Sequence, residues 1–446
     1  MRKGLLRIVS VILALFAAMF AASCNNGDSA DTGFTKGDKT KLTIWITAKN
    51  QPQYFQGYFK KAFEAKNSDI ELQFVAQTND KLSAGLDAAF SGRNAPDMAS
   101  TWAGPVLSVL ARTNCIVNLD DIMTPQEDNM VESALLNKVD GHHYCAPIFG
   151  FTSPTIFYNK TVFDQNGLTV PETYEELVAL SQKIRGIKTS GGSQKYETMV
   201  TGYSYHFLMG LHARTCTEEE LKVVANSQSG DKGVFDAEGF KNGFLWLEDM
   251  VKDGVFAQNV SGYNETQATA AFTLQKSLMI ATTSLDLLEL NNNAQFEIGA
   301  FLLPDAPAKY KPTYGEGKTE NGEVTGVYTD SFVINNSTTD EKKAACKKVI
   351  EFFYSKEAQA ELFNYFLFPA RNDIGYEAVN AKIKGVFDGT LKGIYEKAKV
   401  DGMGVFYMTY AQKSGVMGNL ESGAKSIMNG ASGENGYESV RAFFNA

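Results

Sequence analysis

The sequence predicts an α/β fold of about two domains, and three observations predict it. Strand-like and helix-like patterns alternate: an apolar β-rich run at 42–46 precedes helical spacing at 54–63, and an alternating run at 70–74 precedes helical spacing at 82–90. Such alternation builds a mainly parallel sheet. The length of 446 residues exceeds what one compact core fills. Hydrophobic residues at 44% and charged residues at 21% are globular values, which argues against a disordered chain.

Local signals mark the ends of later elements. Asp140 and Gly141 predict a hairpin turn, because an Asp-Gly pair accepts the positive φ angles of a type I′ turn. The apolar face at 240–251 predicts a helix that ends near Gly254, and the Pro-, Gly- and Lys-rich stretch 305–325 predicts a long loop. Two pairs predict capping boxes at helix starts: Thr173 with Glu176, and Thr217 with Glu220.

The N-terminal residues have the organisation of an export signal. Arg2, Lys3 and Arg7 carry positive charge, and an apolar run at 8–22 ends in small residues. The apolar run is short for a helix that spans a membrane. The sequence therefore predicts a signal peptide at 1–23.

The residue after this signal is a cysteine. Small residues directly before Cys24 resemble the bacterial lipobox, in which the Cys is acylated, although Ala21 stands where that pattern usually has Leu. We expect lipidation of Cys24 and a polar, flexible, lipid-anchored tether at 24–37. An uncleaved anchor and ordinary secretion with a free thiol are the alternatives.

Export also makes disulfides possible for the later cysteines. Four cysteines allow three pairings, and none of these four forms a C-x-x-C motif. Buried free thiols are the alternative, because a chain of this size needs no covalent staples. The four residues are Cys115, Cys145, Cys216 and Cys346.

Composition and motifs exclude several kinds of chemistry. A net charge of −9 repels phosphate backbones, so no nucleic-acid partner is predicted. The four histidines lack metal-ligand spacing: His142 and His143 would point to opposite faces of a strand, and all four are expected to be hydrogen-bonded surface imidazoles. The stretch 315–319 lacks the first Gly of a phosphate-binding loop, and 202–206 lacks the last Gly of a nucleophile elbow. We therefore predict no catalytic residue, no metal and no cofactor.

The order of motifs resembles extracellular solute-binding proteins of family 1, the substrate receptors of bacterial ABC importers, which include the maltose-binding protein. Departures from the family pattern are Tyr174 and Leu285 in place of Trp, Gln275 in place of Gly, and Leu278 in place of Ala. The matching segments are the Trp-bearing strand 42–46, Gly92 to Asp97, Ile116 to Asp120, Gly141 to Pro147, Tyr158-Asn159-Lys160, Phe163, Gly167-Leu168, Pro171, Thr173, 276–279, 301–304 and 368–371.

The resemblance implies a two-lobed, periplasmic-binding-protein-like α/β fold of type II. Lobe one would comprise 38–148 plus 329–367, and lobe two 151–326 plus 372–446. Because each lobe is discontinuous, several chain crossings would form the hinge between them. The expected crossings lie near Phe149, Val327 and Arg371.

A sugar presents apolar faces and a polar hydroxyl rim, so a complementary site combines aromatic rings with hydrogen-bonding groups. In open α/β sheets these groups lie beyond the carboxyl ends of the strands. The resemblance places a stacking aromatic at Trp102, for which interior packing is the alternative, whereas Trp246 is expected in the core. The predicted ligand-binding residues are Lys49, Asn50, Gln51, Trp102, Phe151, Thr152, Tyr203, Tyr205, Thr283, Ser284, Tyr328, Asp330, Arg371, Phe406 and Tyr407.

The function implied is that of a sugar receptor. A monomeric lipoprotein, held to a bacterial membrane by its N-terminal lipid, would bind a small carbohydrate and pass it to the membrane subunits of an ABC permease. The alternatives are a receptor of the same fold for a polyol phosphate or a peptide, an exported glycosidase, and a purely structural surface lipoprotein.

Overall fold

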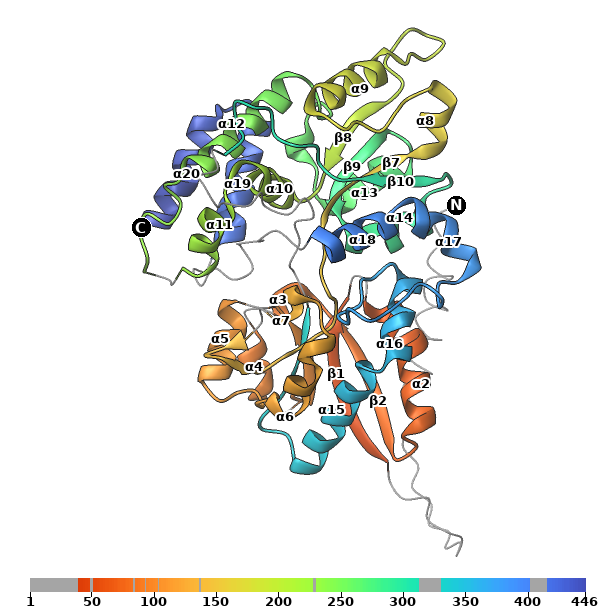
Figure 1. Ribbon diagram of the computed structural model, residues 1–446, viewed down its shortest axis with the longest axis vertical. Helices are drawn as coiled ribbons and strands as arrows, with labels where there is room; N and C mark the ends of the chain where they lie inside the picture. Colours follow the sequence, from red (N-terminus) through yellow and green to blue (C-terminus); the bar gives the residue numbers. More distant parts are fainter. Residues whose placement is uncertain are drawn as a thin grey trace, which may run out of the picture. The chain divides into compact units, whose positions relative to one another are not determined.

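The computed structural model describes residues 39–48, 51–82, 85–92, 94–102, 104–135, 138–227, 230–312, 330–401 and 415–446. Thr40–Ala446 form one unit of the chain. In the described ranges, a five-stranded sheet, a four-stranded sheet and a two-stranded hairpin lie among helices (Figure 1). The predicted signal peptide and tether lie outside the described residues.

The first sheet has the strand order β2-β1-β3-β11-β6. Strand β1 lies parallel to β2 and β3, whereas β11 lies antiparallel to β3 and β6. The prediction of a strand at 42–46 is confirmed, and its side chains at 42, 44 and 46 are fully buried. The bounds are β1 (Thr40–Thr47), β2 (Ile70–Gln77), β3 (Met98–Thr101), β6 (Ala146–Pro147) and β11 (Ser331–Ile334).

The second sheet has the order β10-β7-β9-β8. Only β8 and β9 are parallel neighbours in it, while β7 lies antiparallel to both β9 and β10. The bounds are β7 (Pro154–Asn159), β8 (Glu197–Thr201), β9 (Ser277–Thr283) and β10 (Ile298–Phe301).

The expectation of a mainly parallel sheet is therefore wrong. Strands β7 and β11 both begin at the sheet edge where their neighbours β9 and β3 end. A strand that begins at that edge must run antiparallel to those neighbours. Helical crossovers of the βαβ type make the pairs β1/β2, β1/β3 and β8/β9 parallel.

Helices fill most of the chain between the strands (Figure 1). The first half contains η1 (Gln53–Phe59), α2 (Lys60–Lys66), α3 (Asn79–Leu82), α4 (Leu86–Phe90), α5 (Pro105–Arg112), α6 (Asp120–Met123), η2 (Thr124–Asn129), α7 (Glu132–Leu135), α8 (Lys160–Asn166), α9 (Tyr174–Gly186), α10 (Ser204–Thr215) and α11 (Glu218–Ala225). The second half contains α12 (Glu238–Lys252), η3 (Val260–Gly262), α13 (Glu265–Thr273), η4 (Ser284–Asp286), α14 (Leu287–Asn293), α15 (Asp340–Phe353), α16 (Lys356–Glu361), η5 (Leu362–Tyr365), α17 (Ala381–Gly389), α18 (Leu391–Asp401), α19 (Val416–Met428) and α20 (Gly433–Asn445).

Most local signals are confirmed. Asp140 and Gly141 have φ angles of 52° and 84° between β4 (Lys138–Val139) and β5 (His142–His143), as the hairpin turn requires. Thr217 and Glu220 form a complete capping box at α11. At α9 only half of the box forms, because the Glu176 carboxylate accepts a hydrogen bond from the backbone of Glu172 rather than from that of Thr173.

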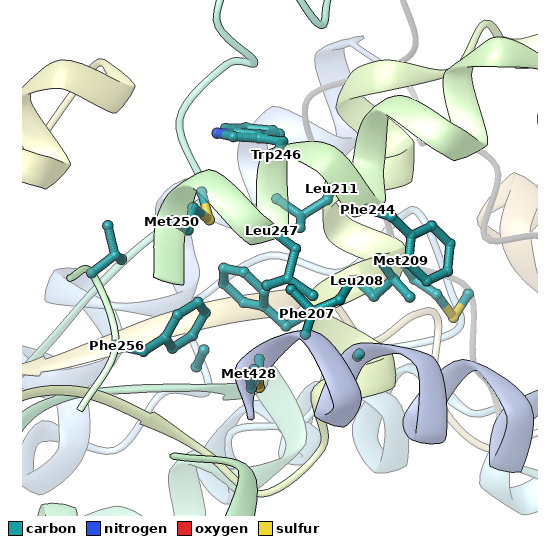
Figure 2. Packing of buried hydrophobic residues seen from close by; sticks show 14 of the residues in the cluster. Phe207, Leu208, Met209, Leu211, Phe244, Trp246, Leu247, Met250, Phe256 and Met428 are labelled. Carbon is teal, nitrogen blue, oxygen red and sulfur yellow. The ribbon is translucent and has the colours of Figure 1, made fainter. Parts of the chain in front are cut away.

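Hydrophobic clusters hold the helices on the sheets. Figure 2 shows one of them, in which Phe207 and Leu208 of α10 lie near Leu247 of α12 and Met428 of α19. Trp246 is fully buried in this cluster, so its predicted place in a core is confirmed. Burying such large rings removes about 150–250 Å² of surface each, which makes them major contributors to folding.

Three segments distant in sequence run side by side where the chain passes between the sheets. The backbone N–H of Ile148 donates to the carbonyl of Asp330 at 2.6 Å, and that of Gly150 donates to Phe368 at 2.9 Å. A Cβ at Gly150 would lie 2.1 Å from the Pro369 carbonyl oxygen, so this approach requires glycine. These contacts lie at two of the predicted crossings, while Val327 lies outside the described residues and the lobe boundaries stay a prediction.

Over the ranges that the structure describes, no helix is both long and apolar enough to cross a membrane.

Candidate functional site

Polar side chains gather at one edge of the first sheet. Strand β1 ends at Thr47, and β11 begins at Ser331, which pairs with Thr101 at the end of β3. Asp330 therefore lies at the carboxyl ends of β1 and β3, the edge at which ligands bind in open α/β sheets. Its Oδ2 accepts hydrogen bonds from the Thr47 hydroxyl at 3.1 Å and from the side-chain amide of Gln51.

The network around Asp330 extends to two neighbours. The side-chain oxygen of Gln51 accepts a hydrogen bond from the Thr47 backbone at 3.1 Å, which orients the Gln51 amide nitrogen toward Asp330. The Ser100 hydroxyl lies 3.4 Å from the Thr47 hydroxyl. All four side chains are buried. Gln51 and Asp330 are among the predicted ligand-binding residues, whereas Thr47 and Ser100 are not, although Thr47 ends β1 and Ser100 stands one residue before the end of β3.

The environment of Asp330 is unusual for a carboxyl group. Burial raises its pKa to about 7 from the ordinary value of 3.8, and the hydrogen bonds from Thr47 and Gln51 only partly oppose this. Its Oδ1 atom is buried and has no hydrogen-bond partner within the described part of the chain. A buried polar atom without a partner is costly, so an atom of this kind marks a candidate functional position.

Trp102 directly follows β3 at the same edge. Its side chain is half-buried and packs against a cluster that contains Leu107, Leu110 and Val139. Half-burial leaves part of its surface accessible, so the structure agrees with neither pure interior packing nor full exposure. Its role in stacking on a ligand stays a prediction.

The second sheet has a comparable edge. Strand β9 ends at Thr283, which pairs with Pro154 at the start of β7. The hydroxyls of Thr152 and Ser284 lie 3.2 Å apart, and the Ser284 hydroxyl also accepts a hydrogen bond from the Ser153 backbone at 3.1 Å. The structure thus brings the predicted residues Thr152, Thr283 and Ser284 together, although they come from segments about 130 residues apart.

Two predicted tyrosines follow β8 at this edge. The rings of Tyr203 and Tyr205 lie 5.8 Å apart, and both contact His206. The Tyr203 hydroxyl hydrogen-bonds the Glu265 carboxylate, and Glu421 accepts a hydrogen bond from the Tyr205 backbone at 2.8 Å. Both tyrosines are half-buried, so part of each ring is accessible.

Two other predicted residues are largely occupied by protein contacts. Phe151 stacks on Phe368 at 4.2 Å between ring centroids and is 1% exposed. The Arg371 guanidinium is buried and donates to Asp373, Gln126 and the Tyr354 carbonyl. These contacts leave little of either side chain for a ligand, and their place in the site stays a prediction. The other predicted residues lie outside the described residues: Lys49, Asn50, Tyr328, Phe406 and Tyr407.

The histidines do not form a metal site. His142 and His143 point to opposite sides of β5, as expected, and contact Asp120 and Glu127 respectively at 2.7 Å. The expectation of four surface imidazoles is wrong, because His143 and His212 are buried. Burial lowers the pKa of His212 to about 3, so this residue is neutral in the core. Within the described ranges, no group of three or more potential ligands could hold a metal ion.

The alternative of free thiols holds for the later cysteines. Within the described residues none of the four forms a disulfide, and Cys145, Cys216 and Cys346 are buried. Burial raises the pKa of the Cys145 thiol to about 12, which makes it a poor nucleophile at neutral pH.

Comparison with known proteins decides the family. A family model described as bacterial extracellular solute-binding protein matches residues 59–383. The chain belongs to this family. A solute-binding protein of an extracellular family is exported, and its α/β fold is the type II periplasmic-binding-protein fold, as predicted.

Individual relatives differ in what they bind. The solute-binding protein is 24% identical over 386 residues to the multiple sugar-binding protein of Streptococcus mutans, which covers 81% of this chain and 80% of the relative. It is 23% identical over 340 residues to the sn-glycerol-3-phosphate-binding periplasmic protein UgpB of Escherichia coli, which covers 72% of each chain. A solved chitin oligosaccharide binding protein matches with a TM-score of 0.70 at 18% identity, over 91% of this chain and 98% of that one. The structural likeness shows the fold.

Proposed function

We propose that this protein is the substrate-binding lipoprotein of a bacterial ABC importer, which captures a sugar or oligosaccharide and delivers it to the permease. The observation that carries this proposal is the set of buried hydroxyl, amide and carboxyl groups beside the half-buried Trp102 at one sheet edge. Such a combination suits a ligand with apolar faces and a hydroxyl rim. A multiple sugar-binding protein that is similar to this chain over most of its length supports the same ligand class.

Binding is coupled to closure in this proposal. A ligand that contacts Asp330 and Trp102 in one lobe and Tyr203 and Ser284 in the other favours the closed form, because only that form makes both sets of contacts. Micromolar affinity requires about −8 kcal/mol, which a few stacked rings and hydrogen bonds can supply in a site that excludes water. No bond of the ligand is broken, so the protein is a receptor and not an enzyme.

The N-terminal segment completes the proposal. Signal cleavage before Cys24 and acylation of its thiol would tether a monomeric receptor to the membrane near its permease. Two chains are tested by expression in a bacterium: the full-length protein should partition into the membrane fraction, and its Cys24→Ser variant should be released or retained as uncleaved precursor. Equal membrane partitioning and processing of both chains would contradict lipidation.

A melting-temperature panel tests the sugar claim. Galactose, maltotriose, raffinose and N,N′-diacetylchitobiose are added separately to the purified protein, together with native mass spectrometry of untreated protein for a co-purified ligand. A bound sugar raises the melting temperature by mass action. At a hundredfold excess over Kd it adds about 2.7 kcal/mol to the free energy of unfolding. A melting temperature unmoved by every sugar, with no co-purified carbohydrate, would contradict the proposal.

A phosphate-bearing polyol is the second candidate ligand, because one relative is an sn-glycerol-3-phosphate-binding protein. An anionic ligand requires cationic or donor groups. Of the predicted cationic residues within the described ranges, Arg371 is buried and already contacts Asp373. We therefore rank this candidate second and include sn-glycerol 3-phosphate in the panel.

A further inference from the structure

Asp330 has one carboxyl oxygen that the protein satisfies and one that it does not. Oδ2 receives hydrogen bonds from Thr47 and Gln51, whereas Oδ1 is buried without a partner among the described residues. The side chain is 3% exposed, and the Asp330 backbone carbonyl is held by the N–H of Ile148 at 2.6 Å. The carboxyl group is thus fixed in place with one acceptor atom left over.

The neighbours of Asp330 that the structure describes are uncharged. On β1 and after it these are Thr47 and Gln51, and on β3 they are Ser100 and Thr101. Strand β6 contributes Pro147 beside Ser331, and the nearby titratable groups Cys145 and Tyr354 are protonated because burial raises the pKa of each. No charged group of the described chain contributes to the shifted pKa of Asp330, which results from burial. The missing partner is therefore a hydrogen-bond donor from outside the described protein atoms.

We propose that Asp330 is a specificity-determining residue of this receptor: its Oδ1 accepts a hydrogen bond from a hydroxyl group of an uncharged sugar, and capture of that sugar releases a proton. The proposal rests on the proposed function, which puts the sugar at this sheet edge. In the empty protein the carboxyl group is about half protonated at pH 7 and mostly protonated at pH 6. When the sugar hydroxyl donates to Oδ1, the carboxylate form is stabilised, and the proton leaves to solvent.

Two consequences separate this receptor from a phosphate receptor. A buried carboxylate repels an anionic ligand, so sn-glycerol 3-phosphate should bind more weakly than an uncharged sugar. Because the sugar binds the ionised form, its affinity should rise with pH and level off above the pKa of Asp330, which burial raises to about 7. Linkage then predicts a Kd about tenfold lower at pH 8 than at pH 6.

Isothermal titration calorimetry tests the proposal with the panel sugar that gives the largest rise in melting temperature. The wild-type protein should bind it about tenfold more tightly at pH 8 than at pH 6, and should release about half a proton per sugar at pH 7 when buffers of different ionisation enthalpy are compared. The variant Asp330→Asn should bind more weakly at pH 8, with less than a twofold change between the two pH values. The proton count needs no variant, so a sugar that binds without proton release at pH 7 overturns the proposal even if Asp330→Asn fails to fold.

Asp97 provides a matched control. It is a buried aspartate at the opposite edge of the same sheet, just before β3, where it pairs with Lys342 at 3.1 Å. The variant Asp97→Asn should keep the tenfold pH dependence. His206 is a second ionisable side chain near the predicted site, in contact with Tyr203 and Tyr205, and Asp330→Asn leaves it intact. A pH dependence that survives in Asp330→Asn therefore overturns the proposal.

The two proposals fail in different ways. If no panel sugar binds at pH 8, the proposed function itself is wrong. If a sugar binds with equal affinity at pH 6 and pH 8 and releases no proton at pH 7, the sugar-receptor function stands and the role of Asp330 is overturned. Tighter binding of sn-glycerol 3-phosphate than of every sugar also overturns it.

Discussion

The Thr47 hydroxyl donates a hydrogen bond to the Asp330 carboxylate at 3.1 Å, across 283 positions of the sequence. This bond joins the end of β1 to the residue before β11 at one edge of the first sheet. Because β11 is inserted antiparallel between β3 and β6, the late segment of the chain delivers a carboxyl group to the edge that the early strands create. The predicted ligand site depends on that insertion.

The free energy of unfolding of the ligand-free protein should depend on pH through Asp330. Its carboxyl group has a pKa of about 7 in the folded protein and the ordinary value of 3.8 in the unfolded chain. Between these two values the folded state keeps a proton that the unfolded state loses. This contribution is present at low pH and is lost as pH rises from about 4 to 7. The difference in free energy of unfolding between Asp330→Asn and wild type, measured by urea unfolding, should shift by about 2–3 kcal/mol in favour of the variant between pH 5 and pH 8. Parallel pH profiles for the two proteins would contradict the shifted pKa.

Replacement of Trp102 by alanine should weaken sugar binding about tenfold or more, or about 1.4 kcal/mol, because a stacked ring is lost. Calorimetry with the panel sugar measures this effect. Trp45 of β1 is the matched control, since it is also half-buried and packs against the same cluster. The variant Trp45→Ala should lower stability but leave the affinity within about twofold of wild type. Equal losses of affinity in both variants would mean that Trp102 acts only through packing.

Replacement of Gly150 by alanine should disturb the passage between the sheets. A Cβ there would meet the Pro369 carbonyl at 2.1 Å and strain the hydrogen bond from Gly150 to Phe368. We expect a loss of about 1–3 kcal/mol in the free energy of unfolding, the usual range for overpacking. Gly418 of α19 is the control, because a Cβ there meets no atom within 4 Å and alanine favours a helix. A Gly150→Ala protein as stable as Gly418→Ala would argue against the close approach.

The thiols should differ in reactivity. Cys145, Cys216 and Cys346 are buried with raised pKa values, whereas Cys115 is half-buried. In the native mature protein without Cys24, a thiol reagent such as DTNB should label Cys115 first, and Cys115→Ser should remove this fast phase. In urea all four thiols should react. Fewer than four reactive thiols under those conditions would reveal a disulfide.

Local patterns predicted the parts of the fold that depend on neighbouring residues. The strand at β1, the turn at Asp140 and Gly141, and the burial of Trp246 follow from alternation, from turn chemistry and from helical spacing. Capping at α9 was only half right, because Glu172 competes successfully for the Glu176 carboxylate. That competition depends on backbone geometry, which the sequence pattern does not specify.

The candidate site was harder to predict because its parts meet only in the folded chain. The position rule for strand ends placed Gln51 and Ser284 at sheet edges, whereas Thr152 was placed by the expected crossing near Phe149. It did not reveal that Asp330 has no cationic partner among the described residues, or that the Arg371 guanidinium pairs with Asp373. The insertion of β11, which brings Asp330 to this edge, is a long-range event that no local pattern encodes, whereas the Arg371–Asp373 pair joins residues only two positions apart.

The most direct measurement of the central claim is calorimetric titration of the purified mature protein at pH 8 with galactose, maltotriose, raffinose, N,N′-diacetylchitobiose and sn-glycerol 3-phosphate. The account predicts that at least one sugar binds one-to-one with a Kd of about 1 μM or lower, and that sn-glycerol 3-phosphate binds more weakly. Binding of the phosphate alone, or of none of these compounds, would contradict it.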